Sequence, residues 1–153
     1  MSTRSTTELT EQLDEYTEKA WNDKEYDAVD DLFAETVTIH NVATGTDYDG
    51  RAAFKEWIRG VHEGFPDFTV EYTTDDTIVG EHKIAQQWTV SGTHEGTLPD
   101  AGIEATGNRV EFDGVTVFEL DDGKVTEAWW YYDMLAFLDQ LGLIPEEMQR
   151  AVA

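Results

Sequence analysis

The sequence contains no cysteine, which excludes disulfide bonds, thiolate nucleophiles and zinc sites with thiolate ligands. Only histidine and carboxylate side chains are left as possible metal ligands. Their spacing shows neither a His-x-His nor a His-Glu-x-x-His pattern. A Gly-x-Ser-x-Gly sequence for a serine nucleophile is also missing. We therefore expect a protein that works without a metal ion or a cofactor.

Basic residues are scarce, with 10 Lys plus Arg against 33 Asp plus Glu and a formal net charge of −23. Such a charge repels phosphates and anionic lipid head groups, so we expect no nucleic-acid partner and no membrane partner. The chain has no run of apolar residues long enough to span a bilayer, and its first eight residues lack an apolar core. These features predict a cytoplasmic protein. The acidic residues are spread over the whole chain, which is typical of halophilic proteins from salt-rich cytoplasms.

No Pro-, Gly- or Ser-rich linker and no internal repeat divides the 153 residues, of which 40% are hydrophobic and 12% aromatic. This length and composition suffice for one hydrophobic core. We predict a single domain over residues 1–153, with its core at about residues 8–143 and a short C-terminal tail.

The first third of the chain has helical periodicity. A capping box at residues 5–8 and apolar residues at helical spacing predict a helix over about residues 6–21. Asn22 or Asp23 could cap a second, short helix that ends near Phe33, and Asp49 precedes a third helix that ends at Gly64. A closing helix follows Asp133.

Strand periodicity predominates after Pro66. Before Pro66, residues 37–41 predict one short strand. After Pro66, four longer strands are predicted, at residues 68–72, 84–93, 109–120 and 125–132. Residues 121–123, Asp-Asp-Gly, have the composition of a hairpin turn. The order of elements predicts an α+β fold in which N-terminal helices pack on one side of a curved, mostly antiparallel sheet. Such a sheet encloses a cone-shaped cavity.

Alternation along the last strand places Trp129, Tyr131 and Asp133 on one face and Trp130 and Tyr132 on the other. If the first face is interior, burial raises the pKa of Asp133, as a general base for a carbon acid requires. The alternative is that Asp133 only caps the following helix. Both roles are compatible.

Other candidates for the pocket are aromatic or hydrogen-bonding side chains. His40, Trp88, His94, Tyr131 or Gln87 could donate hydrogen bonds to a developing negative charge, and Tyr16 and Trp129 could line the cavity. Packing is the alternative role for His40, and loop stabilisation is the alternative for His94. His62 and His82 have polar neighbours and are expected at the surface.

Five fragments in order carry a family resemblance. They are Phe65-Pro66-Asp67-Phe68, residues 88–96 (WTVSGTHEG), residues 107–112 (GNRVEF), residues 122–133 (DGKVTEAWWYYD) and Gln140-Leu141-Gly142. Over about residues 8–143 the chain resembles the SnoaL-like polyketide cyclase family. The resemblance implies a conical fold like that of nuclear transport factor 2, also called cystatin-like, with the pocket inside the cone.

The resemblance also implies a chemistry. Family cyclases use an aspartate near the end of the last strand as acid and base, and the pattern Trp-x-Tyr-x-Asp places this role on Asp133. The family reaction is an intramolecular aldol closure of an ester-bearing polyketide, without metal or cofactor. This sequence departs from the family at Gln87, where an arginine often stands, and the difference argues against an anion-binding task. The resemblance further implies a homodimer formed sheet to sheet, for which we expect Trp130, Tyr132, Val115 and Val117 to face outward.

We therefore predict a cofactor-independent polyketide (ester) cyclase or isomerase-type enzyme that acts on an enolisable carbonyl compound. Its ligand would be a small hydrophobic or polycyclic carbonyl molecule. The first alternative is a non-catalytic protein that binds a small hydrophobic molecule in the same pocket. The second is water addition like that of limonene epoxide hydrolase, which needs an Asp-Arg-Asp network that the five arginines do not obviously supply.

Overall fold

The computed structural model describes residues 6–73, 75, 77–97 and 102–152. Its helical segments are α1 (Thr6–Tyr16), the π-helix η1 (Thr17–Asn22), the 3₁₀ turn η2 (Tyr26–Ala28), α2 (Val29–Leu32), α3 (Arg51–Gly64), α4 (Met134–Gln140) and α5 (Glu146–Val152). Its strands are β1 (Phe33–Asn41), β2 (Thr46–Asp49), β3 (Thr69–Tyr72), β4 (Ile78–Val79), β5 (Lys83–Thr93), β6 (Arg109–Asp121) and β7 (Lys124–Tyr132).

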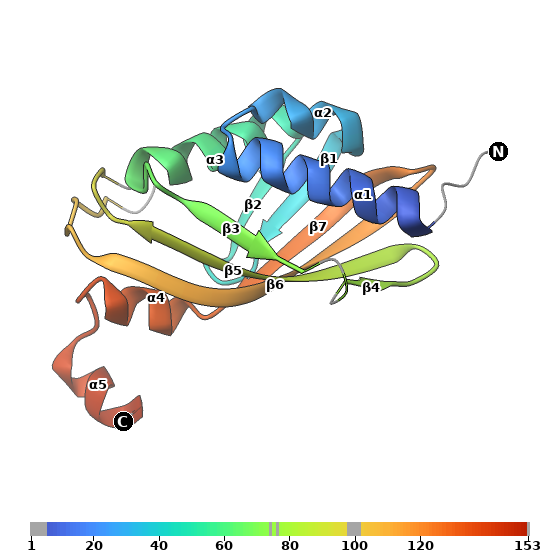
Figure 1. Cartoon of the computed structure of the whole chain (residues 1–153). Coiled ribbons are helices and arrows are strands. Elements are labelled where there is room, and N and C mark those ends of the chain that lie inside the picture. The colour runs from blue at the N-terminus through green and yellow to red at the C-terminus, as the bar shows by residue number, and fades with distance from the viewer. Residues whose placement is uncertain (1–5, 74, 76, 98–101, 153) are drawn as a thin grey trace.

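The strands form one curved sheet with the order β2-β1-β7-β6-β5-β3, and β4 pairs with β5. Every pair is antiparallel except β1 with β7. Figure 1 shows α1, α2 and α3 together over one side of the sheet, while α4 lies below β6. The predicted α+β fold, with helices packed on a curved and mostly antiparallel sheet, is confirmed.

Most predicted elements are present, with differences at their ends. The first predicted helix is helical throughout, although its last turn is the π-helix η1. The predicted cap at Ser5 lies outside the described residues. Asn22 does not cap a helix, because its side chain bonds both the N–H and the C=O of Val70 on β3. Gly50, and not Asp49, precedes α3, and the polar stretch before it forms the unpredicted strand β2.

The hairpin between β6 and β7 is confirmed. Asp122 and Gly123 both have positive φ angles, of 53° and 77°. Two consecutive residues with positive φ are the mark of a type I′ turn, whose twist suits a two-residue hairpin.

A β-bulge in β7 decides which side chains face the helices. Glu127 pairs with Glu119 of β6, but Val125 pairs with the next residue, Leu120, so Thr126 is an extra residue without an opposite partner. Val125 is buried on the helix side, and after the bulge Trp130 faces that side too. The expectation that Trp130 and Tyr132 face outward is therefore wrong. Side chains alternate regularly from Glu127 onward. Because of the bulge, however, Trp130 and not Trp129 lies on the same face as Val125.

The core between helices and sheet is built mainly from aromatic rings. Phe33 and Phe54 lie 5.0 Å apart between ring centroids, and Phe33 and Phe118 lie 6.2 Å apart. All three side chains are fully buried. Burial of a side chain of this size contributes about 1.5–3 kcal/mol to stability.

His62 is buried, contrary to the expectation that it lies at the surface. Its Nε2 donates a hydrogen bond to the carbonyl oxygen of Trp21 at 2.7 Å, and its Nδ1 lies 3.0 Å from the Tyr26 hydroxyl. Burial lowers the pKa of His62, although the bond to Trp21 opposes this shift. The imidazole therefore joins the end of the π-helix to α3.

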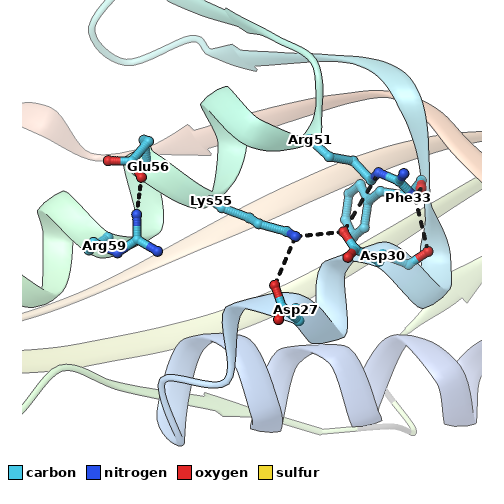
Figure 2. A network of polar contacts seen from close by, with 7 residues as sticks. All are labelled: Asp27, Asp30, Phe33, Arg51, Lys55, Glu56 and Arg59. Atoms are coloured by element: carbon cyan, nitrogen blue, oxygen red, sulfur yellow. Dashed lines mark hydrogen bonds and ion pairs between the residues drawn. The ribbon is translucent and has the colours of Figure 1, made fainter.

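Basic side chains of α3 hold the junction between α2 and β1 (Figure 2). Lys55 Nζ lies 3.0 Å from a carboxylate oxygen of Asp27 and 2.7 Å from one of Asp30. Arg51 lies 3.6 Å from the Asp30 carboxylate and donates to the backbone carbonyls of Asp30 and Phe33. These contacts fix α3 over the sheet and thereby position one wall of the cavity described next.

Candidate functional site

A cavity of about 710 Å³ lies between the concave face of the sheet and the helices. This volume is within the range of small-molecule pockets. Side chains from α1 and η1, from α3, from the strands and from α4 surround it, and aromatic residues predominate: Tyr16, Trp21, Tyr48, Trp57, Phe65, Phe68, Trp88, Phe112, Phe118, Trp130, Tyr132 and Phe137.

The strand register orders the concave face into rows that run across the sheet. The middle row consists of Gln86, Thr116, Trp130 and Asn41, on β5, β6, β7 and β1. The row nearer α4 consists of Trp88, Gly114 and Tyr132. A third row, deeper under the helices, consists of Ile84, Phe118, Ala128 and Ile39. The polar groups of the floor are therefore concentrated in the middle row.

Asn41 is the first of these polar groups. Its side chain is 3% exposed and lines the cavity, yet its Oδ1 has no hydrogen-bond donor within the described part of the chain. An unpaired buried carbonyl oxygen is costly, so such an atom is a natural acceptor for a ligand group.

Tyr132 stands beside Asn41 at the end of β7. Burial raises the pKa of the Tyr132 hydroxyl, while a hydrogen bond with the Asn41 side chain lowers it in part. The hydroxyl is therefore neutral near pH 7 and able to donate a hydrogen bond. Together the two side chains offer an acceptor and donors within one corner of the cavity.

Two of the predicted binding residues, Tyr16 and Trp88, do line the cavity. The Tyr16 hydroxyl accepts a hydrogen bond from Trp21 Nε1 at 2.8 Å, and burial raises the pKa of Tyr16. Trp88 Nε1 donates to Thr116 Oγ1 at 2.8 Å. Gly114 makes room for the Trp88 ring, because a Cβ there would lie 2.2 Å from it.

His40, Trp129 and Tyr131 lie on the convex face, outside the cavity. The His40 ring stacks on Trp129 and lies between Asp47, 2.8 Å from Nδ1, and Glu127, 2.6 Å from Nε2. Burial lowers the pKa of His40, but the hydrogen bonds to the two carboxylates outweigh this, so the pKa lies above its ordinary value. Tyr131 is 42% exposed. The phase of β7 after its bulge explains why Trp129 and Tyr131 do not reach the cavity, and His40 lies between Ile39 and Asn41, which occupy the buried face of β1.

His94 is fully buried but does not line the cavity. Its ring stacks on Phe65 with 5.1 Å between centroids, and its Nδ1 accepts a hydrogen bond from the backbone N–H of Thr106 at 3.1 Å. Burial lowers the pKa of His94. These contacts match the alternative role of loop stabilisation.

Asp133 caps α4, because its Oδ1 accepts a hydrogen bond from Ala136 N at 2.9 Å. Its side chain is exposed and is not part of the cavity lining, although both of its chain neighbours, Tyr132 and Met134, line the cavity. The interior position expected for the Asp133 carboxylate is therefore not found. The carboxylate lies outside the wall that α4 contributes.

The charge of the cavity lining is purely acidic. Its carboxylates belong to Glu56 and Glu63 on α3, both exposed, and no Lys, Arg or His occurs among the described lining residues. Within the described residues, no group of three or more His, Asp or Glu side chains could hold a metal ion.

Sequence reasoning missed Asn41, Gln86, Thr116 and Tyr132 as pocket residues. Alternation already placed Asn41 on the same face as Ile39 and Val37, which are the most apolar residues of β1. A polar residue that continues the apolar face of a strand is a signal that could have identified it. No comparable signal exists for Tyr132, because its face depends on the bulge.

Comparison with known proteins is consistent with this architecture. The family model of the SnoaL-like polyketide cyclases matches residues 11–141. The chain belongs to the SnoaL-like polyketide cyclase family. No curated protein matches the chain.

Solved structures with the same fold are similar over nearly the whole chain. AclR of Streptomyces galilaeus, a hydroxylase candidate, is 26% identical with a TM-score of 0.76, covering 92% of this chain and 100% of its own. A SnoaL-like polyketide cyclase candidate from Jannaschia sp. CCS1 is 21% identical with a TM-score of 0.80, covering 95% and 100%.

A protein of ketosteroid isomerase-like fold from Catenulispora acidiphila is 18% identical with a TM-score of 0.72, covering 92% and 96%. The predicted family and the fold related to nuclear transport factor 2 are thus confirmed. None of the described helices is both long and apolar enough to cross a membrane.

Proposed function

We propose that this family member binds a neutral, hydrophobic carbonyl compound of the polyketide type in its aromatic cavity. The observation that carries the proposal is the unpaired Oδ1 of Asn41, buried in a cavity that is otherwise lined mostly by rings. The family membership supports the chemical type of ligand.

The groups around Asn41 favour an enolised 1,3-dicarbonyl. Asn41 Oδ1 needs a donor. The enol O–H supplies it by sharing its hydrogen between Asn41 and its own neighbouring carbonyl oxygen, to which the Tyr132 hydroxyl can also donate. A single enolised dicarbonyl group of the ligand would then form hydrogen bonds with both Asn41 and Tyr132. An anionic ligand is disfavoured, because the lining carries Glu56 and Glu63 and no basic residue.

Titration with matched compounds tests the proposal. 2-Acetyl-1-tetralone, which is largely enolised, should bind more tightly than tetralin, by about three- to ten-fold for the added hydrogen bonds. Asn41→Leu should abolish this preference while the dissociation constant of tetralin stays unchanged. If neither compound binds the wild-type protein, the proposal fails.

Catalysis is the second candidate function. Asp133 does not line the cavity, but its sequence neighbours Tyr132 and Met134 do, and its cap bond to Ala136 N fixes its carboxylate beside this edge of the cavity. This position favours acid–base chemistry on a carbon that reaches the edge. The proposal is a cofactor-independent aldol closure or isomerisation.

The steps follow from these roles. The Asp133 carboxylate takes the proton from a carbon flanked by carbonyls, and Tyr132 donates to the enolate oxygen. The enolate carbon then forms a bond to a second carbonyl carbon of the same molecule. The resulting alkoxide takes back the proton from Asp133, so no co-reactant is needed.

Proton exchange separates the two candidates. Asp133→Asn keeps a cap acceptor, so the fold and ligand affinity should persist. If wild-type protein incorporates solvent deuterium into a panel of β-keto esters and the variant does not, Asp133 is the acid–base group. Equal rates of deuterium incorporation with wild type and with Asp133→Asn would favour the first candidate function, ligand binding without catalysis.

We also propose, from composition and family, that residues 1–153 form one domain of a cytoplasmic, halophilic protein that is a homodimer. The convex face, with Trp129, Tyr131, Val115 and Val117, is the surface proposed for the dimer. Sedimentation velocity in concentrated KCl tests the dimer, and a monomer at all protein concentrations would contradict it.

A further inference from the structure

The middle row of the cavity floor has a second polar end. Gln86 and Thr116 lie directly opposite each other on β5 and β6, and Thr116 lies opposite Trp130 on β7. Asn41 follows beyond Trp130, on β1. Neighbouring strands are about 4.8 Å apart, so Thr116 and Asn41 are roughly 10 Å apart across the indole of Trp130.

Gln86 is held in one orientation by a residue outside the cavity. Its side chain is 2% exposed, and its Nε2 donates to Oδ1 of Asp14 on α1 at 3.4 Å. A carboxylate only accepts, so this contact favours the amide orientation with the NH₂ group toward α1. Gln86 lines the cavity, and its carbonyl oxygen is the amide atom that is not turned toward Asp14.

Thr116 complements Gln86. Its Oγ1 accepts the Trp88 Nε1–H bond at 2.8 Å, which leaves its own hydroxyl hydrogen available as a donor. Trp88 cannot shift easily, because its ring crosses β6 directly over Gly114, where even a Cβ would clash. An acceptor and a donor thus lie side by side on the floor, and both are buried.

We infer that Gln86 and Thr116 form a second subsite, which binds a hydroxyl group of the ligand. The hydroxyl hydrogen is donated to the Gln86 carbonyl oxygen, and the hydroxyl oxygen accepts from Thr116. Asp14 acts as a positioning residue for Gln86. This inference rests on the proposed function, because it takes the ligand to lie in the cavity with its carbonyl end at Asn41.

The two subsites together define the ligand more closely. It is a neutral ring compound that lies against Trp130, with an enolisable carbonyl at one end and a hydroxyl group at the other. A carboxylate at the Gln86 end would meet the lone pairs of an amide oxygen and the nearby negative charge of Asp14, so it is excluded.

The experiment compares 2-acetyl-1-tetralone with its 6-hydroxy derivative by NMR titration of the tryptophan indole N–H signals. The hydroxy compound should bind wild-type protein about three- to ten-fold more tightly. In Gln86→Met this ratio should fall to about one, while the parent compound keeps its dissociation constant. The matched control is Gln87→Met, the same change one residue along β5 at an exposed position, which should keep the wild-type ratio.

Asp14→Asn tests the positioning role without altering the cavity surface. Asparagine can donate as well as accept, so the Gln86 amide should no longer be fixed and the ratio should fall below that of the wild type. The parent compound should bind as before. This variant also keeps the inference testable if Gln86→Met fails to fold.

Each result has a distinct meaning. Equal binding of both compounds to wild-type protein, or a wild-type affinity ratio in Gln86→Met, overturns the subsite. A wild-type affinity ratio in Asp14→Asn overturns the positioning role of Asp14. Failure of both compounds to bind wild-type protein overturns the proposed function instead.

Discussion

Gly114→Ala should destabilise the protein strongly, because Gly114 is the point at which the cavity floor has no spare room. A Cβ at this position would lie 2.2 and 2.5 Å from two ring atoms of Trp88 and 2.7 Å from the backbone oxygen of Tyr131. Carbon atoms pack at about 3.5–4.0 Å, so Trp88 would have to move by about 1 Å or more. The movement would break its bond to Thr116.

The expected loss has two parts. Overpacking of a core typically costs about 1–3 kcal/mol, and the lost hydrogen bond about 1 kcal/mol more. We therefore expect a decrease of about 2–4 kcal/mol in the free energy of unfolding, together with weaker ligand binding.

Urea denaturation at constant KCl measures this decrease. The matched control is Gly60→Ala on α3, where an added Cβ meets nothing within 4 Å. That change should raise the free energy of unfolding by about 0.5–1 kcal/mol, because alanine favours a helix over glycine. Wild-type stability in Gly114→Ala, or an unmoved Trp88 in its structure, would refute the packing argument.

Three further predictions concern the cap, a buried histidine and the basic side of α3. Asp133→Ala should lower the free energy of unfolding by about 1 kcal/mol and Asp133→Asn by much less, since asparagine also caps helices; equal losses in urea denaturation would argue against the cap. Burial lowers the pKa of His62, so the unfolded chain binds a proton that the folded chain does not. Wild-type stability relative to His62→Gln should thus fall as the pH drops through 6.5 and level off below the folded-state pKa; parallel curves against pH would contradict this. Lys55→Met leaves the carboxylate of Asp30 without its closest cation, which should cost up to about 1 kcal/mol in dilute salt and less in concentrated KCl. A loss of stability that does not depend on salt would contradict this prediction. The control is Lys19→Met, which removes the more exposed ion pair of Lys19 with Glu15.

The long, regular strands could be predicted from the sequence because their alternation is strong. β5 places buried side chains at every second position over most of its length, and β6 does so at Thr116 and Phe118. The turn at Asp122 and Gly123 was equally clear, since its positive φ angles favour these residue types. β2 could not be predicted, because its residues are mostly exposed and polar and it is held to β1 by backbone pairing.

The site was harder to predict than the fold. Aromatic residues at regular spacing indicated that a hydrophobic hollow would exist, and Tyr16 and Trp88 do line it. The inward face of β7 could not be predicted, because one extra residue, Thr126, reverses the side on which Trp129 and Trp130 lie. A bulge of this kind depends on the pairing with β6, which alternation within one strand does not reveal.

The position of the carboxylates limits where any chemistry can occur. A base for a carbon acid works best where water is excluded, yet the carboxylates of Glu56, Glu63 and Asp133 are all exposed. Asp14 lies behind Gln86. The floor itself offers amide and hydroxyl groups, which bind and orient but do not remove a proton from carbon. Proton transfer would therefore take place at the edge of the cavity, where Tyr132 is followed by Asp133. The carbon that exchanges hydrogen should then be the one next to the carbonyl at Asn41, and ring positions near Gln86 should remain unlabelled.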